Sequence, residues 1–196
     1  MRVGIDVFEE VASGNSSCYI SADYYYTGKH PGLAYWTSVP FGMTSPEWCA
    51  WVKFGGGQAL WDEVSGEFGL KAITCGSTGT QAGGWFNKEI NSIDDINGIK
   101  MRIPGLAGEV FTRAGGETVT LPGNEIFLAL QQGVIDAAEW VGPYNDMTFG
   151  FHQVAEYYYY PGWHEPAAIL DCFINLKKWN SLPDDLKKVV SLSAKA

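Results

Sequence analysis

The fold is decided by the stretch Asn124-Glu-Ile-Phe-Leu-Ala-Leu-Gln-Gln-Gly-Val-Ile-Asp-Ala-Ala-Glu-Trp-Val-Gly-Pro143. Asn124 is a typical N-cap residue, and Gly133 is the glycine expected directly after a helix end. The apolar run 134–138 is short, as in a strand that is covered on both faces. We therefore predict a helix, a buried strand, and then Glu139 and Trp140 at the carboxyl end of that strand, where open α/β sheets bind ligands.

The composition bounds the class of protein. The 196 residues are 46% hydrophobic and include 22 acidic and 13 basic side chains, which allows one large domain or two small lobes. The acidic balance argues against a nucleic-acid surface, and no apolar run is long enough to span a membrane. The start of the chain lacks the pattern of a secretory signal. Because the four cysteines lack metal or redox spacing, we expect isolated buried thiols at Cys18, Cys49, Cys75 and Cys172.

Alternating helices and strands predict an α/β fold. We expect strands at 18–26, 70–74, 99–103 and 117–121. A capping box should begin a helix at 44–47, a short capped helical turn is expected at 92–98, and a helix over 58–68 should bury Leu60. Two tyrosine runs, 24–26 and 157–160, would point alternate rings to opposite sides if they lie in strands.

Four side chains in loops and at strand ends are the candidate ligand-binding groups: Gln81, Arg102, Glu139 and Glu165. An arginine beside aromatic rings commonly binds a small carboxylate through two parallel hydrogen bonds from its guanidinium. Two glutamates near such a ligand would repel it unless a hard cation lies between them. From spacing alone, a structural ion pair for Arg102 and a turn-capping role for Glu165 stay open.

Several motifs occur in the order of a known family. They are 24–29, 39–42, 80–86, 88–91, 100–102, 133–143 and 157–165. Together they resemble the substrate-binding proteins of tripartite ATP-independent periplasmic (TRAP) transporters, over nearly the whole chain. The match is to the branch that binds 2-oxo and 2-hydroxy monocarboxylates such as pyruvate or lactate.

This resemblance implies a two-lobed periplasmic-binding-protein fold that closes on its ligand. Arg102 would bind the substrate carboxylate, and Gln81 and Glu139 would also contact the substrate. Trp140 would line the pocket with one of Tyr24, Tyr25 and Tyr26, of which Tyr25 is favoured. A sodium or calcium ion would be held by four groups: the side chains of Gln81, Glu139 and Glu165 and the backbone carbonyl of Trp140. The expected lobes are 1–75 and 76–160, with 161–196 as a crossover and the start of an inter-lobe helix. The implied partner is a TRAP membrane permease, and the implied location is the periplasm.

Members of this family are longer than this chain. The resemblance therefore implies a signal peptide, a strand and a helix before Arg2, and a long helix beyond Ala196; it leaves monomer and homodimer open. Two other functions stay open: a hydrolase that uses Glu139 and Glu165 as acid and base, and a metal-independent carbohydrate- or peptide-binding module. His164 is expected to be a packed or supporting residue. We predict a solute receptor that is not an enzyme.

Overall fold

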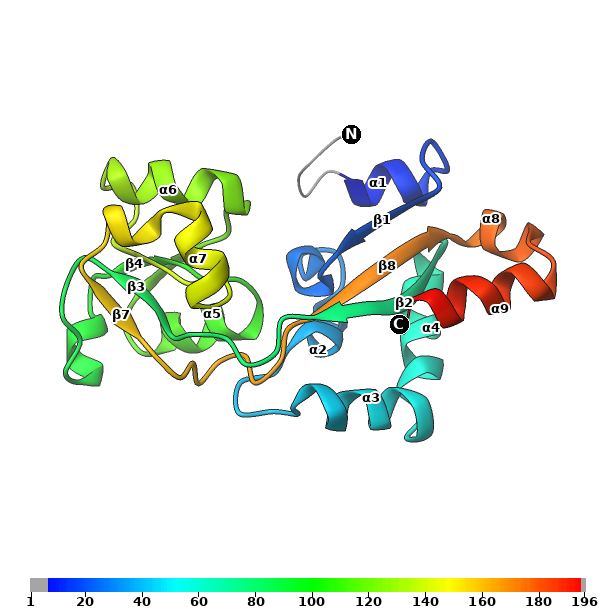
Figure 1. Cartoon of the computed structure of the whole chain (residues 1–196), viewed down its shortest axis with the longest axis horizontal. Coiled ribbons are helices and arrows are strands. Elements are labelled where there is room, and N and C mark those ends of the chain that lie inside the picture. Colours follow the sequence, from blue (N-terminus) through cyan, green and yellow to red (C-terminus); the bar gives the residue numbers. More distant parts are fainter. Residues whose placement is uncertain (1–6, 195–196) are drawn as a thin grey trace. The chain divides into compact units, whose positions relative to one another are not determined.

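The structure is a computed structural model that describes residues 7–194, and these residues form two compact units (Figure 1). Unit 1 comprises 7–37, 43–78 and 168–194, and unit 2 comprises 38–42 and 79–167. The main boundaries between the units therefore lie at 78–79 and at 167–168. The expected lobe boundaries were at 75–76 and 160–161. Those expected boundaries stay a prediction for the longer proteins of the family.

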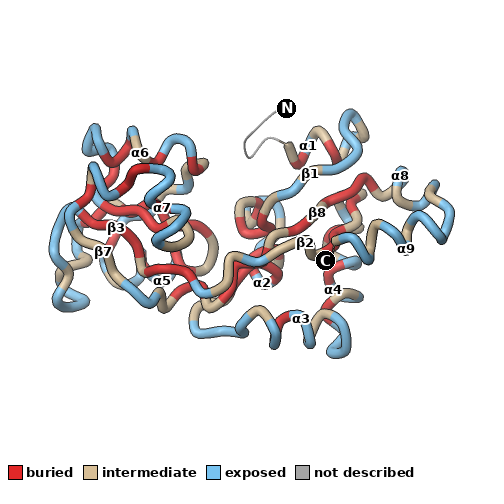
Figure 2. Tube along the Cα trace, in the orientation of Figure 1, coloured by how far each residue is buried: buried red, intermediate tan, exposed pale blue. Residues whose placement is uncertain are grey.

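Unit 1 is built on an antiparallel sheet in the order β1–β8–β2. Its strands are β1 (Cys18–Ser21), β8 (Ile169–Asn175) and β2 (Leu70–Ser77). The central strand β8 is buried along most of its length (Figure 2). Helix α1 packs on β1 and β8, and α4 packs on β2. The helical elements are α1 (Val7–Ala12), η1 (Asp23–Tyr26), η2 (Pro31–Leu33), α2 (Ala34–Thr37), α3 (Ser45–Phe54), α4 (Gly57–Glu67), α8 (Leu176–Ser181) and α9 (Asp184–Ser193).

Tryptophans form the centre of the unit 1 core. Trp61 of α4 is fully buried, stacks on Trp36 at 6.1 Å between ring centroids, and meets Trp48 edge-on at 5.7 Å. The prediction that Leu60 faces the core is wrong, because its side chain is 52% exposed. Helix α4 instead turns Trp61 inward, where its indole N–H donates to the buried carboxylate of Asp23 at 2.7 Å.

Unit 2 is built on a mixed sheet in the order β5–β4–β6–β3–β7. Strand β4 runs parallel to β5 and β6, and β3 runs antiparallel to β6 and β7. The strands are β3 (Gly84–Phe86), β4 (Lys100–Arg102), β5 (Glu117–Val119), β6 (Ala137–Ala138) and β7 (Tyr157–Tyr159). The helical elements are η3 (Ile93–Ile96), α5 (Gly105–Arg113), α6 (Gly123–Gln131), α7 (Pro143–Phe149) and η4 (Phe151–Gln153).

Apolar side chains cover both faces of the unit 2 sheet. Successive residues of a strand point to opposite faces, so Trp85 and Phe86 enter different core clusters. The run 157–160 follows the same alternation in β7. Tyr158 stacks on Trp85 at 4.2 Å between centroids, whereas Tyr159 meets Phe86 edge-on at 5.3 Å. The predicted alternation of this tyrosine run is therefore confirmed.

The segment 124–143 confirms the predicted order of helix and strand but corrects two details. Asn124 is not the helix cap, because α6 begins one residue earlier and Pro122 is its N-cap. Gly133 has the positive φ of +68° that a helix-ending glycine adopts. The predicted strand 134–138 is reduced to β6, and Val134 is 52% exposed. The reason is that the Val134 N–H still bonds the helix carbonyl of Ala129 at 2.9 Å.

Two further predictions are wrong. The tyrosines 24–26 lie in the short 3₁₀ helix η1 and not in a strand, because β1 ends at Ser21. The thiols are not buried: Cys18 and Cys49 are exposed, and the other two, Cys75 and Cys172, are half-buried. The capping box at 44–47 is confirmed, with Glu47 accepting from a backbone N–H at 2.9 Å, and the capped turn expected at 92–98 is also found, with Asp95 accepting from the Ser92 N–H at 2.9 Å. Within residues 7–194, no helix has the length and apolar character needed to cross a membrane.

Candidate functional site

Arg102 and Glu139 meet at the carboxyl ends of two parallel strands. In the register of β4 and β6, Arg102 lies opposite Ala138, so Glu139 follows directly at the same edge. The guanidinium Nη1 of Arg102 donates to Glu139 Oε1 at 2.5 Å and to the Glu139 backbone carbonyl at 3.0 Å. Its Nε donates to the carbonyl of Leu121 at 3.0 Å. Both side chains are fully buried, which makes this ion pair a rigid part of the sheet edge.

Backbone hydrogen bonds bring two more loops to this edge. The Gln81 N–H donates to the Glu165 carbonyl at 3.0 Å, and the Gly162 N–H donates to the Gln81 carbonyl at 2.9 Å. The Ala82 N–H donates to the Val141 carbonyl at 2.9 Å, which ties the same loop to the residues after β6. The Gln81 side chain is 1% exposed. The four residues at positions 81, 102, 139 and 165 therefore lie in one buried region of unit 2.

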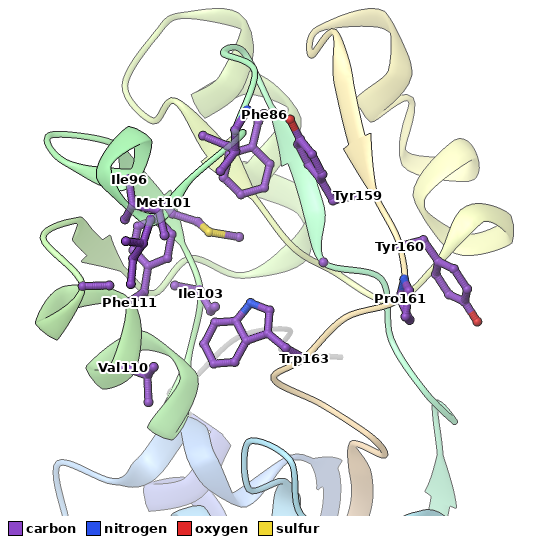
Figure 3. A pocket seen from close by; sticks show the side chains of 14 residues that line it. Phe86, Ile96, Met101, Ile103, Val110, Phe111, Tyr159, Tyr160, Pro161 and Trp163 are labelled. Atoms are coloured by element: carbon purple, nitrogen blue, oxygen red, sulfur yellow. Dashed lines mark hydrogen bonds between the residues drawn. The ribbon is translucent and has the colours of Figure 1, made fainter.

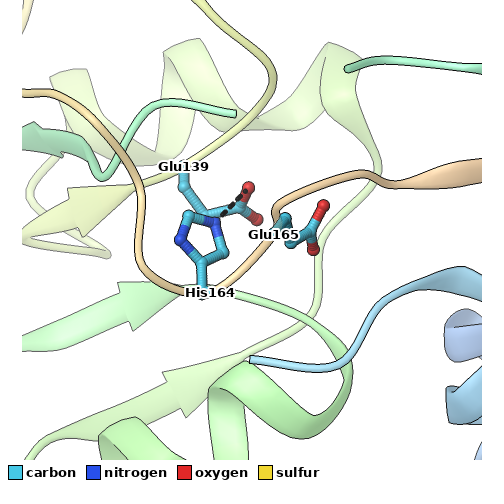
Figure 4. A group of neighbouring side chains, drawn as sticks. All are labelled: Glu139, His164 and Glu165. Atoms are coloured by element: carbon cyan, nitrogen blue, oxygen red, sulfur yellow. Dashed lines mark hydrogen bonds and ion pairs between the residues drawn. The ribbon is translucent and has the colours of Figure 1, made fainter. Parts of the chain in front are cut away.

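Glu139, Glu165 and His164 form a compact group of acids and an imidazole (Figure 4). One potential ligand atom from each side chain lies within 4.8 Å of the others. His164 Nε2 lies 3.3 Å from Glu139 Oε2, so the two carboxylate oxygens of Glu139 face a guanidinium and an imidazole. Glu165 Oε2 is buried and has no hydrogen-bond partner.

The charges of this group do not balance. Within residues 7–194, Arg102 is the only lysine or arginine that is fully buried, and it lies against two buried glutamates. Burial raises the pKa of Glu165 well above its ordinary value; repulsion from Glu139 adds to this, and Arg102 opposes it. Glu165 therefore needs a proton or a cation to be satisfied. The carboxylates and the Gln81 side chain supply hard oxygens, so these residues fit a sodium or calcium ion, which would add positive charge between the protein and an anionic ligand.

The indole of Trp140 packs on the cation of the ion pair. The Arg102 guanidinium carbon lies 5.2 Å from the Trp140 ring centroid, within the range of a cation–π contact. Gly123 at the start of α6 makes room for this ring, because a Cβ there would approach the Trp140 ring to 2.6 Å. Tyr25 belongs to unit 1, where it lies half-buried in η1. Its part in this site stays a prediction.

Two supporting residues were underrated or missed at the sequence level. His164 was expected to be a packed or supporting residue, and it contacts Glu139 directly. Asp146 was not singled out. Its carboxylate accepts from the N–H groups of Val141 at 3.1 Å and Gly142 at 3.0 Å, which holds the loop that follows Trp140. The signal available was an acid three residues after the Gly-Pro pair at 142–143, a common helix-start pattern.

A separate hollow in unit 2 has a different character (Figure 3). It has a volume of about 470 Å³ and is lined by apolar and aromatic side chains, including Met101, Phe111 and Trp163. Its lining contains no ionisable group apart from two tyrosines, Tyr159 and Tyr160. It therefore lacks the convergent charges that a small carboxylate requires, and the buried group around Arg102 is the better candidate.

Comparison with known proteins agrees with the geometry. The chain is 48% identical over 186 residues to a monocarboxylate 2-oxoacid-binding periplasmic protein of Nostoc sp., covering 95% of this chain and 51% of the relative. A TRAP periplasmic solute-binding protein of Pseudoalteromonas atlantica T6c, solved with sodium and pyruvate, is 46% identical with a TM-score of 0.94; the match covers 97% of this chain and 58% of that one. The counterpart from Colwellia psychrerythraea, solved with calcium and pyruvate, is 46% identical with a TM-score of 0.92, over 96% and 57%.

The chain thus spans about half the length of the curated relative and somewhat more of the solved proteins. The α/β class and the resemblance to TRAP solute-binding proteins are confirmed. Residues 3–196 match the family described as bacterial extracellular solute-binding protein, family 7 (DctP). The chain therefore belongs to this family of extracellular solute-binding proteins.

Proposed function

We propose that this chain acts as an extracytoplasmic receptor that captures a small 2-oxo or 2-hydroxy monocarboxylate together with a sodium or calcium ion. The observation that carries the proposal is the burial of Arg102, Glu139 and Glu165 together at one sheet edge. One arginine against two buried glutamates leaves an acidic remainder that a cation would neutralise. The two solved proteins named above hold sodium or calcium with pyruvate, which supports the same ligand class here.

Each residue has a defined role in this proposal. Arg102 binds the substrate carboxylate while Glu139 keeps the guanidinium oriented. Gln81, Glu139, Glu165 and the backbone carbonyl of Trp140 hold the cation. The Trp140 ring packs beside the bound carboxylate, and Tyr25 covers the ligand from unit 1. A guanidinium suits this site better than a lysine ammonium would, because it can stay bonded to Glu139 and to the Leu121 carbonyl while it also binds the ligand.

The partner in this proposal is a TRAP membrane permease, and the location is the periplasm. Both follow from the relatives, which are periplasmic proteins of TRAP systems or bind 2-oxoacids. The receptor returns its ligand unchanged, so no chemical step is assigned to Glu139 and Glu165. Sedimentation analysis of the protein distinguishes a monomer from a homodimer.

Calorimetric titration tests the proposal directly. Pyruvate, lactate and a branched 2-oxo acid are titrated into the protein with sodium, with calcium, and after removal of both ions. We expect binding of at least one acid, and at least a tenfold loss of affinity without cations. Arg102→Lys keeps the charge but removes the fork, so it should weaken every carboxylate that binds. Glu139→Gln should abolish the dependence on cations, and the exposed Glu125→Gln on α6 is the matched control.

The outcomes separate the alternatives. Equal affinity with and without cations would leave a receptor but remove the metal from the proposal. Binding of sugars or peptides and of none of the acids would favour the metal-independent module. Hydrolysis of a glycoside by the protein, lost in Glu165→Gln, would overturn the receptor function in favour of an enzyme.

A further inference from the structure

Unit 1 buries two aspartates that the proposed receptor site does not use. The side chains of Asp23 and Asp171 are both 0% exposed. Ser21, two residues before Asp23, pairs with Asp171 across β1 and β8, which brings the two acids to the same end of the sheet. The Trp61 indole N–H donates to Asp23 Oδ2 at 2.7 Å. The other oxygen of Asp23 and both oxygens of Asp171 have no hydrogen bond of normal geometry.

No base compensates these acids. Within residues 7–194, no lysine, arginine or histidine forms an ion pair with Asp23 or Asp171. The described titratable groups that interact with them are Tyr19 from β1, Tyr26 from η1, Cys75 from β2 and Cys172 from β8. Burial raises the pKa of Tyr19, and the nearby Tyr26 and acids add to this, so its hydroxyl keeps its proton. Among the described residues of helix α4, the neutral indole of Trp61 is the group that contacts Asp23.

Two ionised carboxylates in this position would repel each other without water or a cation to offset the charge. Burial raises the pKa of Asp171 well above its ordinary value, and Asp23 and Cys75 add to the effect; the backbone of Asp23 opposes it in part. Burial also raises the pKa of Asp23, against the hydrogen bond from Trp61. The cluster therefore favours a state that carries less than two negative charges.

We propose that the buried acids Asp23 and Asp171 together bind one proton at neutral pH, and that this shared charge state stabilises the junction of η1 with β8. One bound proton removes the repulsion between the two acids and leaves a single buried charge, which the Trp61 indole N–H and the backbone of Asp23 help to stabilise. A hard metal ion prefers six or more oxygens, whereas the cluster offers three unsatisfied carboxylate oxygens and one hydroxyl. Because Asp23 begins the helix that carries Tyr24–Tyr26, loss of the proton would loosen that tyrosine turn.

The sign of the pH dependence follows from the raised pKa values. The folded pair binds a proton that the unfolded aspartates release above about pH 4. Stability from this pair is therefore full below the unfolded pKa and is lost as pH rises toward the folded pKa. One proton corresponds to about a tenfold fall of the folding constant per pH unit. Other buried acids of the chain contribute too, so the informative quantity is the difference in slope between wild type and a variant that lacks the pair.

Chemical unfolding of the whole chain at pH 5, 6, 7 and 8 measures this difference. In Asp171→Asn the slope should be shallower than in wild type by about tenfold in folding constant per pH unit. The exposed Asp185→Asn on α9 is the matched control and should keep the wild-type slope. Carboxyl ¹³C NMR of labelled aspartate gives a second measurement on wild type, independent of any variant. It should show two signals that remain protonated or shared at pH 7, and both should disappear or shift in Asp23→Asn.

Two results would overturn the proposal. The first is an equal slope in wild type and Asp171→Asn together with fully ionised aspartate signals at pH 7. The second is stabilisation of wild type by sodium or calcium that persists in Glu139→Gln and is lost in Asp171→Asn, which would make the pair a metal site. The stated NMR signals concern unit 1 only, so failure here leaves the carboxylate receptor of unit 2 untouched.

Discussion

Both units bury acidic side chains, and they differ in what lies opposite the charge. In unit 2, Glu139 faces the guanidinium of Arg102 and the imidazole of His164. In unit 1, Asp23 accepts from the Trp61 indole N–H, and within residues 7–194 neither Asp23 nor Asp171 forms an ion pair with a base. A buried acid with a fixed base is an oriented charged group, whereas a buried acid without one needs a proton or a cation, as Glu165 does in unit 2.

Asp146 of unit 2 is an intermediate case that clarifies the rule. It is fully buried without a base, but it accepts from two backbone N–H groups, from the Trp85 indole at 3.0 Å and from the Tyr158 hydroxyl at 3.4 Å. Burial raises its pKa, while the bonds from Val141, Trp85 and Gly142 lower it. Neutral hydrogen bonds therefore replace part of what a base supplies, and the carboxylate serves to shape a loop.

Removing the base should produce the largest effect. Arg102→Met keeps the length of the side chain but leaves Glu139 buried without its ion-pair partner. Breaking one partner of a buried pair costs about 3–5 kcal/mol. Hydrogen exchange should show that loss in the amides of unit 2, with unit 1 unchanged. The exposed Arg113→Met on α5 is the control. An Arg102→Met protein as stable as wild type would mean that Glu139 does not depend on its base.

Removing the hydrogen-bonded acid should cost less. Asp146→Ala deletes the acceptor of several N–H groups, and a hydrogen bond to a charged group is worth about 1.5–3 kcal/mol. We expect a loss of about 3 kcal/mol in unfolding free energy and weaker ligand binding, because the loop after Trp140 loses its anchor. Asp146→Asn retains part of the acceptor and should recover part of the stability. Equal losses in the two variants would show that shape, and not hydrogen bonding, is what Asp146 supplies.

A steric change beside Trp140 should lower the affinity for carboxylates without altering the charged residues of the site. Gly123→Ala places a methyl group against the Trp140 ring, and such overpacking typically costs about 1–3 kcal/mol. Since the ring lies on Arg102, we expect carboxylate affinity to fall about tenfold in calorimetry while the cation dependence persists. Gly142→Ala is a suitable control, because its added Cβ meets nothing within 4 Å. Unchanged affinity in Gly123→Ala would separate the Trp140 ring from ligand binding.

A change in a helix cap of unit 1 should have the smallest effect on stability. It also serves as a control for the proton that we propose for Asp23 and Asp171. Thr44→Ala removes the hydroxyl of the capping box that begins α3, at a cost of about 1 kcal/mol. The unfolding midpoint in denaturant should fall at every pH by the same amount. A changed pH slope would show that general loss of stability in unit 1 mimics loss of the proton, which would weaken the interpretation of Asp171→Asn.

Local sequence patterns determined much of this protein. The capping box at 44–47, the capped turn at 92–98, the helix end at Gly133 and the strand end before Glu139 were all predicted correctly. These features depend on contacts between residues a few positions apart, so their spacing in the sequence is also their spacing in space. The family resemblance named Gln81, Arg102, Glu139 and Glu165, and the structure places all four in unit 2.

Only the tertiary structure decided which groups meet. Periodicity favoured Leu60 for the core, but a buried carboxylate from η1 draws the Trp61 indole inward. The β-rich composition of 24–26 favoured a strand, but β1 ends at Ser21, and the Tyr24 N–H bonds the distant Thr37 hydroxyl at 3.1 Å. Strand pairing sets Ser21 opposite Asp171, about 150 residues away in sequence, which brings Asp23 to the same end of the sheet. The sequence thus determined the local elements and the candidate ligand groups, whereas long-range pairing decided which buried charges have a base, because burial and charge balance depend on neighbours that no local pattern specifies.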